Sequence, residues 1–288
     1  MSKMNKPKRR HHYIPQFYLK GFTDADPSDP YDKLYVYSKD RIESYGDVMY
    51  LAPKDIGYEK DGYTLRLSDG TTDSEIIENK FAEMDNIAAL LLKKILNGQR
   101  LNEEESNCFT WNFLTTMSMR TPVAREQCKT IANILKINLK WQENMDPLFG
   151  FLQDYDFKLF RAAKWICFKA PVGSYFLTSD NPFLSTKWDN KATILILPLS
   201  KNYCIVGSTN HDFIINNFTK KANQEIRKIN SIIIKSASRD IYCHFKAQSI
   251  YGLVRKYKDS RPEIDGLRVK ELLIKILIDT LVAYLKIK

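Results

Sequence analysis

The sequence has few cysteines and histidines and no long uncharged apolar run. Its five cysteines (Cys108, Cys128, Cys167, Cys204 and Cys243) are far apart and form no C-x-x-C pair. A cysteine zinc site or a disulfide scaffold is therefore disfavoured, and a reducing cytoplasm is the expected location. No run of about 18 apolar residues occurs, which disfavours a spanning helix. Alternating polar and aromatic residues follow the basic start, and not the continuous apolar run of a signal peptide, so we expect no signal peptide and no membrane partner.

Several common enzyme motifs are also missing. The sequence contains no G-x-x-x-x-G-K-[ST], no G-x-G-x-x-G, no H-E-x-x-H and no G-x-S-x-G. These motifs bind phosphates, dinucleotides or zinc, or carry a nucleophilic serine. Their absence disfavours nucleotide-driven motors, dinucleotide oxidoreductases and the common hydrolases.

The chain is long enough and apolar enough to fold around a core of its own. It has 288 residues, of which 44% are hydrophobic and 12% aromatic, so it can bury a sizeable core. We predict a flexible basic tail over 1–10 and a single α+β domain over 11–288. The domain combines a helical middle (about 75 to 145), a mainly antiparallel sheet (about 163 to 208) and C-terminal helices (about 222–238 and 267–287).

The helical middle follows from periodicity and capping. Apolar residues recur at spacings of three and four from Ile77 to Ile95, and Gly98 stands where a helix ends. Asn102 and Glu105 form a capping-box pattern for a second helix that we expect to run to Arg120. Thr121-Pro122 then starts a third helix, expected to reach about residue 141.

Short apolar runs bounded by turn residues predict strands. In the first half the run is "KLYVYSKDR". In the second half the runs are "KWICFKAP", "SYFLTSD", "ATILILPLS" and "NYCIVGS". Strands this short and this close in sequence favour antiparallel pairing.

The net charge is +10, from 44 basic and 34 acidic residues. One interpretation is a lysine-rich solvated surface. The other is a polyanionic partner, with nucleic acid as the expected one. Basic residues at positions 3–10 agree with the second interpretation, although basic arms also serve as solubility tails.

Two of the four histidines are adjacent, in "RRHHYIPQFYLKGF". His11 and His12 precede an apolar segment that we expect to dock into the folded body. Histidine acts as a general base, metal ligand or proton donor near neutral pH. Alternatively, both rings bond local backbone groups or stack on Tyr13.

Three further polar clusters lie in apolar surroundings. "TSDNP" holds Asp180 at the end of a predicted strand, where it could be catalytic or could simply form a turn. Glu78 and Asp85 lie two helical turns apart, on one line at the edge of an apolar face. Arg120 and Arg125 flank the helix break, where each could bind phosphate or hold a carboxylate in the core.

Taken in order, the motifs "HHYIPQFYLKGF", "IENKFAEMD", "RTPVAR", "TSDNP" and "LPLS" resemble the bacterial and fungal family known as domain of unknown function 4238. The resemblance extends from about residue 11 to about residue 244. It supplies no activity, and Asp85 stands where the family usually has Glu. The resemblance implies that the family's marked polar positions form one site: His11, His12, Gln16, Glu78, Arg120, Ser179, Asp180 and Asn181.

We therefore carry two hypotheses of different classes. The first is a nuclease-like phosphodiesterase acting on nucleic acid, assisted by a divalent metal ion whose identity is open. The second is a non-enzymatic nucleic-acid-binding or sensor protein in which the same groups form a structural polar network.

For the first hypothesis, the N-terminal segment crosses the body in an extended form and delivers both imidazoles to the helix carboxylates. The expected catalytic residues are His11, His12, Gln16, Glu78, Arg120 and Asp180. The expected metal ligands are His11, His12, Glu78, Asp85 and Asp180. The expected substrate-binding residues are Arg120, Arg125, Ser179 and Asn181.

Overall fold

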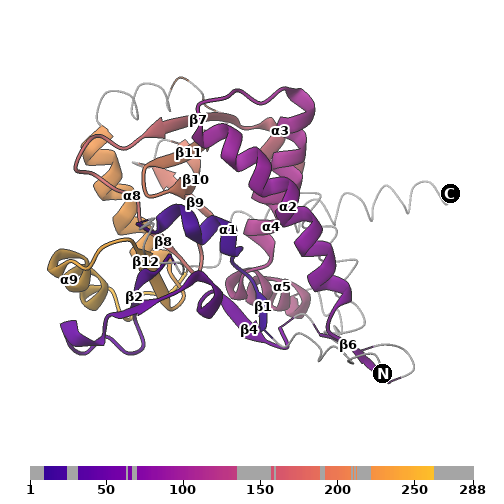
Figure 1. The fold of residues 1–288 in the computed structure, drawn as a ribbon, viewed down its shortest axis with the longest axis horizontal. Coiled ribbons are helices and arrows are strands. Elements are labelled where there is room, and N and C mark those ends of the chain that lie inside the picture. Colours follow the sequence, from indigo (N-terminus) through magenta and orange to yellow (C-terminus); the bar gives the residue numbers. More distant parts are fainter. Residues whose placement is uncertain are drawn as a thin grey trace.

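The protein has the predicted α+β architecture (Figure 1). The computed structural model describes residues 10–24, 32–62, 64–66, 70–134, 157–158, 160–188, 192–208, 210, 212 and 222–262. In Figure 1, helices α2 to α5 gather on one side of the molecule and the main sheets lie beside them. In the part of the chain that the structure describes, every helix is too short or too polar to cross a bilayer.

Two four-stranded antiparallel sheets carry most of the strand residues. The first sheet has the order β7-β11-β10-β9, from Lys164–Lys169, Tyr203–Ser208, Ala192–Ser200 and Leu184–Trp188. The second has the order β3-β2-β12-β8, from Met49–Leu51, Leu34–Ser38, Asp240–Cys243 and Thr178–Ser179. Two small pairs complete the set: β1 (Arg10–His12) with β4 (Tyr58–Lys60), and β5 (Leu65–Arg66) with β6 (Thr72–Asp73).

One short helix lies near the start of the described chain, and the others lie in its middle and at its end. They are α1 (Gln16–Leu19), α2 (Ile76–Leu96), α3 (Glu103–Phe109), α4 (Thr116–Met119), α5 (Pro122–Ile134), α8 (Ala222–Ser236) and α9 (Gln248–Lys256). A π-helical turn, Thr110–Thr115, joins α3 to α4. Short 3-10 turns lie at Lys20–Phe22, Tyr45–Asp47 and Pro53–Asp55.

The signals at helix ends are confirmed. Gly98 has a positive φ of 75° just after α2, and Asn102 accepts a hydrogen bond from the Glu105 backbone N–H at 2.8 Å. The Thr121 hydroxyl accepts from the Ala124 N–H at 3.2 Å, so Thr121 caps α5. The expected continuous α-helix up to Arg120 is wrong, because the π-helical turn interrupts it. The predicted helical residues 135–141 and 267–287 lie outside the described residues.

The sequence-based strand predictions were incomplete. The predicted strand "SYFLTSD" contains only Thr178–Ser179 as strand. Strands β9 and β12 and helix α9 were not predicted at all. The buried β12 reads "DIYC", four residues with one charge, which is too short for a periodicity signal.

The N-terminal segment is docked into the core. Tyr13 and Ile14 both donate their backbone N–H groups to the Gly57 carbonyl, at 2.9 and 3.1 Å. The Tyr18 hydroxyl bridges the Thr178 hydroxyl at 2.7 Å and the Pro198 carbonyl at 2.8 Å. This docking agrees with the expectation, but the segment does not stay extended. It turns into α1 directly after Pro15, and α1 contacts α2 and β10.

We predict that Gly57→Ala destabilises the protein by more than about 2 kcal/mol. Gly57 has φ 64°, and a Cβ there would lie 3.0 Å from the Ile14 Cβ. The variant therefore adds a steric clash to the left-handed backbone strain, which by itself costs on the order of 1 kcal/mol. Urea unfolding followed by tryptophan fluorescence measures the loss.

Gly98→Ala is the matched control, because Gly98 also has a positive φ of 75° but open space around the added Cβ. Gly98→Ala should therefore show only the loss of stability that comes from the backbone strain. Equal losses for the two variants would contradict a tight contact between Gly57 and Ile14.

Candidate functional site

The pairing of β1 with β4 separates the two adjacent histidines. His11 stands opposite Glu59 and His12 opposite Tyr58 in the antiparallel register. Successive side chains of a strand point to opposite faces, so the two imidazoles cannot act as a side-by-side pair. His11 is fully buried, whereas His12 is partly exposed.

His12 lies in a half-buried, positively charged setting. Its Nε2 is 3.3 Å from the Lys54 carbonyl oxygen, and its ring is 5.6 Å from the Tyr58 ring. Burial lowers the pKa of His12 below its ordinary value. The charges of Arg120 and Arg10 lower it further, against the Lys54 hydrogen bond and the Asp55 charge, which raise it. His12 is therefore mostly neutral at neutral pH.

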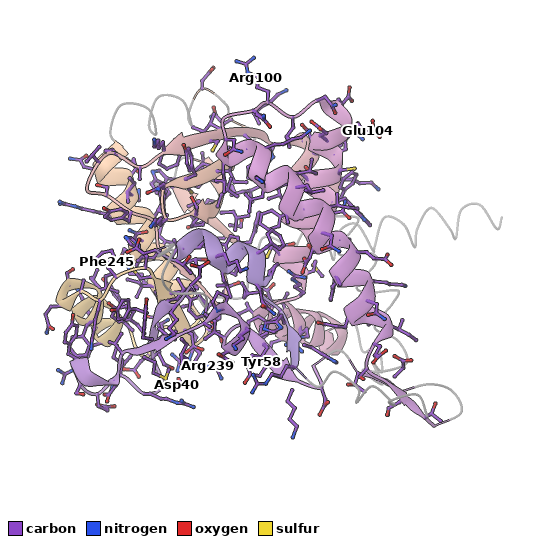
Figure 2. All side chains as sticks on the ribbon, in the orientation of Figure 1. Asp40, Tyr58, Arg100, Glu104, Arg239 and Phe245 are labelled. Carbon is purple, nitrogen blue, oxygen red and sulfur yellow. The ribbon has the colours of Figure 1, made fainter. Side chains whose placement is uncertain are left out.

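Arg10 and Tyr58 complete the outer side of this strand pair. The Arg10 guanidinium lies 4.9 Å from the Tyr58 ring centroid and pairs with Asp55 at 3.2 Å. The Arg10 side chain is 59% exposed, so a ligand can reach it. Figure 2 labels Tyr58 in the lower middle of the molecule, where β1 and β4 lie in Figure 1. Arg10, Asp55 and Tyr58 were not predicted as site residues. Arg10 lies in β1 itself, two residues before His12, whereas the pairing of β1 with β4 places Tyr58 opposite His12.

Arg120 is buried and paired. Its side chain is fully buried and contacts both carboxylate oxygens of Asp85, at 3.1 and 3.3 Å. Its guanidinium also lies 5.3 Å from the Phe81 ring centroid. Burial raises the pKa of Asp85, against the opposing charge of Arg120. Of the two interpretations considered for Arg120, this geometry matches the one in which it holds a carboxylate in the core.

Arg125 ties α5 to the strand pair. Its guanidinium pairs with the Glu59 carboxylate at 2.5 Å and donates to the Gly62 carbonyl at 3.4 Å. Glu59 stands opposite His11. The "RTPVAR" motif therefore contributes one ion pair with α2 and another with β4, which places its two arginines around the N-terminal strand.

Asp180 is buried and binds backbone. Its carboxylate accepts the N–H groups of Ser238, Arg239 and Asp240 at 2.8, 2.7 and 3.1 Å. Burial raises the pKa of Asp180 to about 7, and the nearby charge of Asp240 adds to the effect, while the three hydrogen bonds oppose it. This carboxylate holds the connection from α8 to β12 in place.

The neighbours of Asp180 hold the same connection. Asn181 donates its side-chain amide to the Ser236 carbonyl at 3.0 Å and its backbone N–H to the Ser179 hydroxyl at 3.2 Å. Directly after β2, the buried Lys39 ammonium donates to the Lys235 and Ala237 carbonyls, at 3.1 and 2.7 Å. These bonds account for Ser179 and Asn181 without a ligand.

Tyr13 links the two halves of the arrangement. Burial raises its pKa, and the charges of Asp180, Asp240 and Glu59 raise it further, while Arg239 lowers it. The pKa of Tyr13 therefore responds to charged groups of both halves. The motifs from distant parts of the sequence thus surround β1, but their polar groups mostly bind one another or the backbone.

Two further predicted residues lie on helices. Gln16 is exposed on α1 and Glu78 is half-buried on α2. Across the described ranges, no three His, Cys, Asp or Glu side chains are arranged to hold a metal ion. Asp85 is engaged with Arg120, and Asp180 with backbone N–H groups. The donor set that the structure offers therefore does not fit the predicted metal site.

We predict that Asp180→Asn removes a pH dependence of stability near neutrality. An unfolded Asp has a pKa near 4, below the folded value of about 7. The folded state therefore binds the proton more tightly. The resulting stabilisation is complete below about pH 4 and is lost as the pH rises through 7, by at most about 1.4 kcal/mol per pH unit. Urea unfolding at several pH values measures it.

Asp73→Asn is the matched control, because Asp73 also accepts two backbone N–H groups, at 2.7 and 2.9 Å, but its pKa is lowered. Asp73→Asn should keep the wild-type pH dependence of the unfolding free energy near pH 7. Asp180→Asn should also unfold more easily at every pH, because an amide nitrogen cannot accept the bonds that Oδ2 accepts. Identical slopes for wild type and Asp180→Asn would refute the raised pKa.

Comparison with known proteins gives one match. A family model described as "Protein of unknown function (DUF4238)" matches residues 10–247. No curated protein and no solved structure matches the chain. The matched range covers every motif around β1, from Arg10 to the end of β12, and most of the chain. The chain therefore belongs to the DUF4238 family of proteins of unknown function.

Proposed function

We propose that the protein is a phosphodiesterase acting on nucleic acid, with His12 as its general base. The observation that carries the proposal is the setting of His12, a partly exposed histidine whose pKa is lowered by burial and by the charges of Arg120 and Arg10. A base must be unprotonated and accessible, and a phosphodiester substrate needs positive charge nearby. The overall charge of +10 supports a polyanionic substrate.

The hydrogen bond to Lys54 determines which nitrogen can act. A carbonyl oxygen only accepts, so the Nε2 that faces it at 3.3 Å carries the proton in the neutral ring. The lone pair then resides on Nδ1. In the proposed reaction Nδ1 takes a proton from water or from a sugar hydroxyl, while the oxygen of that group attacks phosphorus and the P–O bond to the leaving alkoxide breaks.

The two arginines have different roles in this proposal. Arg10 is more than half exposed and can bond a phosphate oxygen directly. Arg120 is buried against Asp85 and acts only through its charge. This replaces the expected phosphate clamp at Arg120. No step is assigned to a divalent ion, and its involvement is a separate question that chelator and added Mg²⁺ answer.

A non-enzymatic nucleic-acid-binding function is the second candidate. The observation that favours it is the engagement of Asp85 and Asp180 in structural contacts, together with the pairing of the Asp55 carboxylate, whose charge acts on His12, with Arg10. In this case the protein binds oligonucleotides through the exposed Arg10 and its overall positive charge, and leaves them intact.

We predict that His12→Gln lowers the cleavage rate of labelled single-stranded DNA or RNA by about 10²- to 10⁴-fold, the usual contribution of a general base. The wild-type kcat/KM, which reports the free enzyme, should rise with pH with a midpoint below 6.5 and level off near pH 7, because the neutral ring is the active form. Thermal unfolding should change little.

Lys187→Gln is the control, since Lys187 is an exposed residue of β9 away from β1. It should cleave at the wild-type rate. Each protein is assayed with chelator and with added Mg²⁺. Cleavage that survives in His12→Gln would contradict the role of His12, and binding without any cleavage by wild type would favour the second candidate.

A further inference from the structure

Three aromatic rings form a cluster at the surface, apart from β1. The Tyr175 ring lies 4.4 Å from the His244 ring and 5.7 Å from the Phe245 ring, and His244 lies 4.7 Å from Phe245. Tyr175 and Phe245 are each 36% exposed, whereas His244 is buried beneath them. In Figure 2, Phe245 lies on the side of the molecule away from α2. We call Tyr175, His244 and Phe245 the aromatic platform.

Hydrogen bonds hold the backbone of the platform in place at Tyr175 and at Phe245. The Asn230 side chain of α8 donates to the Tyr175 carbonyl at 2.8 Å and accepts from the Leu177 N–H at 3.0 Å. The Phe245 carbonyl accepts the Tyr37 hydroxyl at 3.3 Å. Exposed aromatic side chains on anchored backbone lose little conformational entropy on binding, which favours recognition of a flat ligand.

The turn before Tyr175 brings a further apolar side chain to the same surface. The Ser174 N–H bonds to the Pro171 carbonyl at 2.9 Å, and Gly173 has φ 80°, as in a type II turn. Val172, at the tip of this turn, is fully exposed. Val172 precedes Tyr175 by three residues, so this exposed apolar side chain is close in the sequence to the platform.

One lysine adjoins the platform in the sequence. Lys246 follows Phe245, and its ammonium lies 4.4 Å from the Tyr45 ring centroid. Burial lowers the pKa of His244 to about 4, while the charge of Asp24 raises it and that of Lys201 lowers it by a smaller amount. Lys201 and Asp24 form an ion pair. The platform is thus an uncharged aromatic surface with a lysine beside it.

We propose that this platform stacks the unpaired bases of single-stranded nucleic acid. Flat aromatic faces with neighbouring cations are the means by which proteins bind single strands without reading sequence. A duplex keeps its bases stacked and cannot use them, so the platform selects single-stranded substrate. This proposal rests on the nucleic-acid substrate proposed above, and it specifies that this substrate is single-stranded.

The test uses fluorescence anisotropy with labelled oligothymidine of about 15 nucleotides, near the upper site size of single-strand-binding folds. Phe245→Ala and Tyr175→Ala should each weaken binding by about 5- to 150-fold, the value of one stacked base. Phe245→Trp should restore binding. The slope of log affinity against log salt should not change, because no phosphate contact is removed.

An abasic oligonucleotide of equal length and charge is the ligand control, and Leu253→Ala is the protein control. Leu253 is also exposed, at 38%, but lies on α9 outside the platform. Phe245→Ala should not alter abasic binding, and Leu253→Ala should not alter either. Equal affinity of wild type for the abasic and normal strands overturns the proposal. So does loss of self-association in Phe245→Ala without change in oligonucleotide binding, which would make the platform a contact between copies.

A small phosphodiester without a base, such as bis(p-nitrophenyl) phosphate, separates this proposal from the one for His12. Phe245→Ala should cleave it as wild type does, whereas His12→Gln should not cleave it. If wild type leaves the small diester intact but the strand-binding results hold, the phosphodiesterase proposal fails and the platform stands.

Discussion

The Gly57 carbonyl is the point on which the arrangement around β1 depends. It accepts both the Tyr13 and Ile14 N–H groups, and no side chain at Gly57 separates it from Ile14. A carbonyl with two donors fixes the direction of the strand as well as its position. With β1 fixed against β4, His11 must be buried and His12 must face outward, because a strand alternates its side chains.

A second constraint is the burial of a positive charge. A buried guanidinium requires a partner, and the two-atom contact between Arg120 and Asp85 supplies it at 3.1 and 3.3 Å. Burial lowers the pKa of His12, and the charge of Arg120 lowers it further. In the proposed reaction Arg120 acts through this charge alone, and the phosphate binds the exposed Arg10.

Local signals in the sequence were enough to predict much of the helical part. The period of α2, the glycine stop at Gly98 and the caps at Asn102 and Thr121 depend on residues within one helical turn. The π-helical turn could not be predicted this way. There the Thr115 hydroxyl bonds to the Thr110 carbonyl, five residues back, at 2.9 Å, and such side-chain bonds compete with the α-helical pattern.

The site was predictable as a set of motifs but not as a geometry. The N-terminal motif was expected to dock, and Tyr13 and Ile14 are indeed buried. Which side of the strand each histidine occupies depends on the register with β4, whose three residues carry no strong strand signal. Likewise, "TSDNP" indicated a polar strand end, but its partner, the backbone of Ser238 to Asp240, lies 58 to 60 residues away.

The central claim is that His12 is a neutral, accessible base beside bound phosphate. A pH titration of its imidazole by NMR, with and without an uncleavable phosphorothioate oligonucleotide, tests this directly. The account predicts a midpoint below 6.5 in the free protein, with the proton on Nε2 above it. The midpoint should move upward when the anionic strand binds, because a nearby negative charge favours the imidazolium. A midpoint at or above 6.5 that does not move on adding the oligonucleotide would contradict the account.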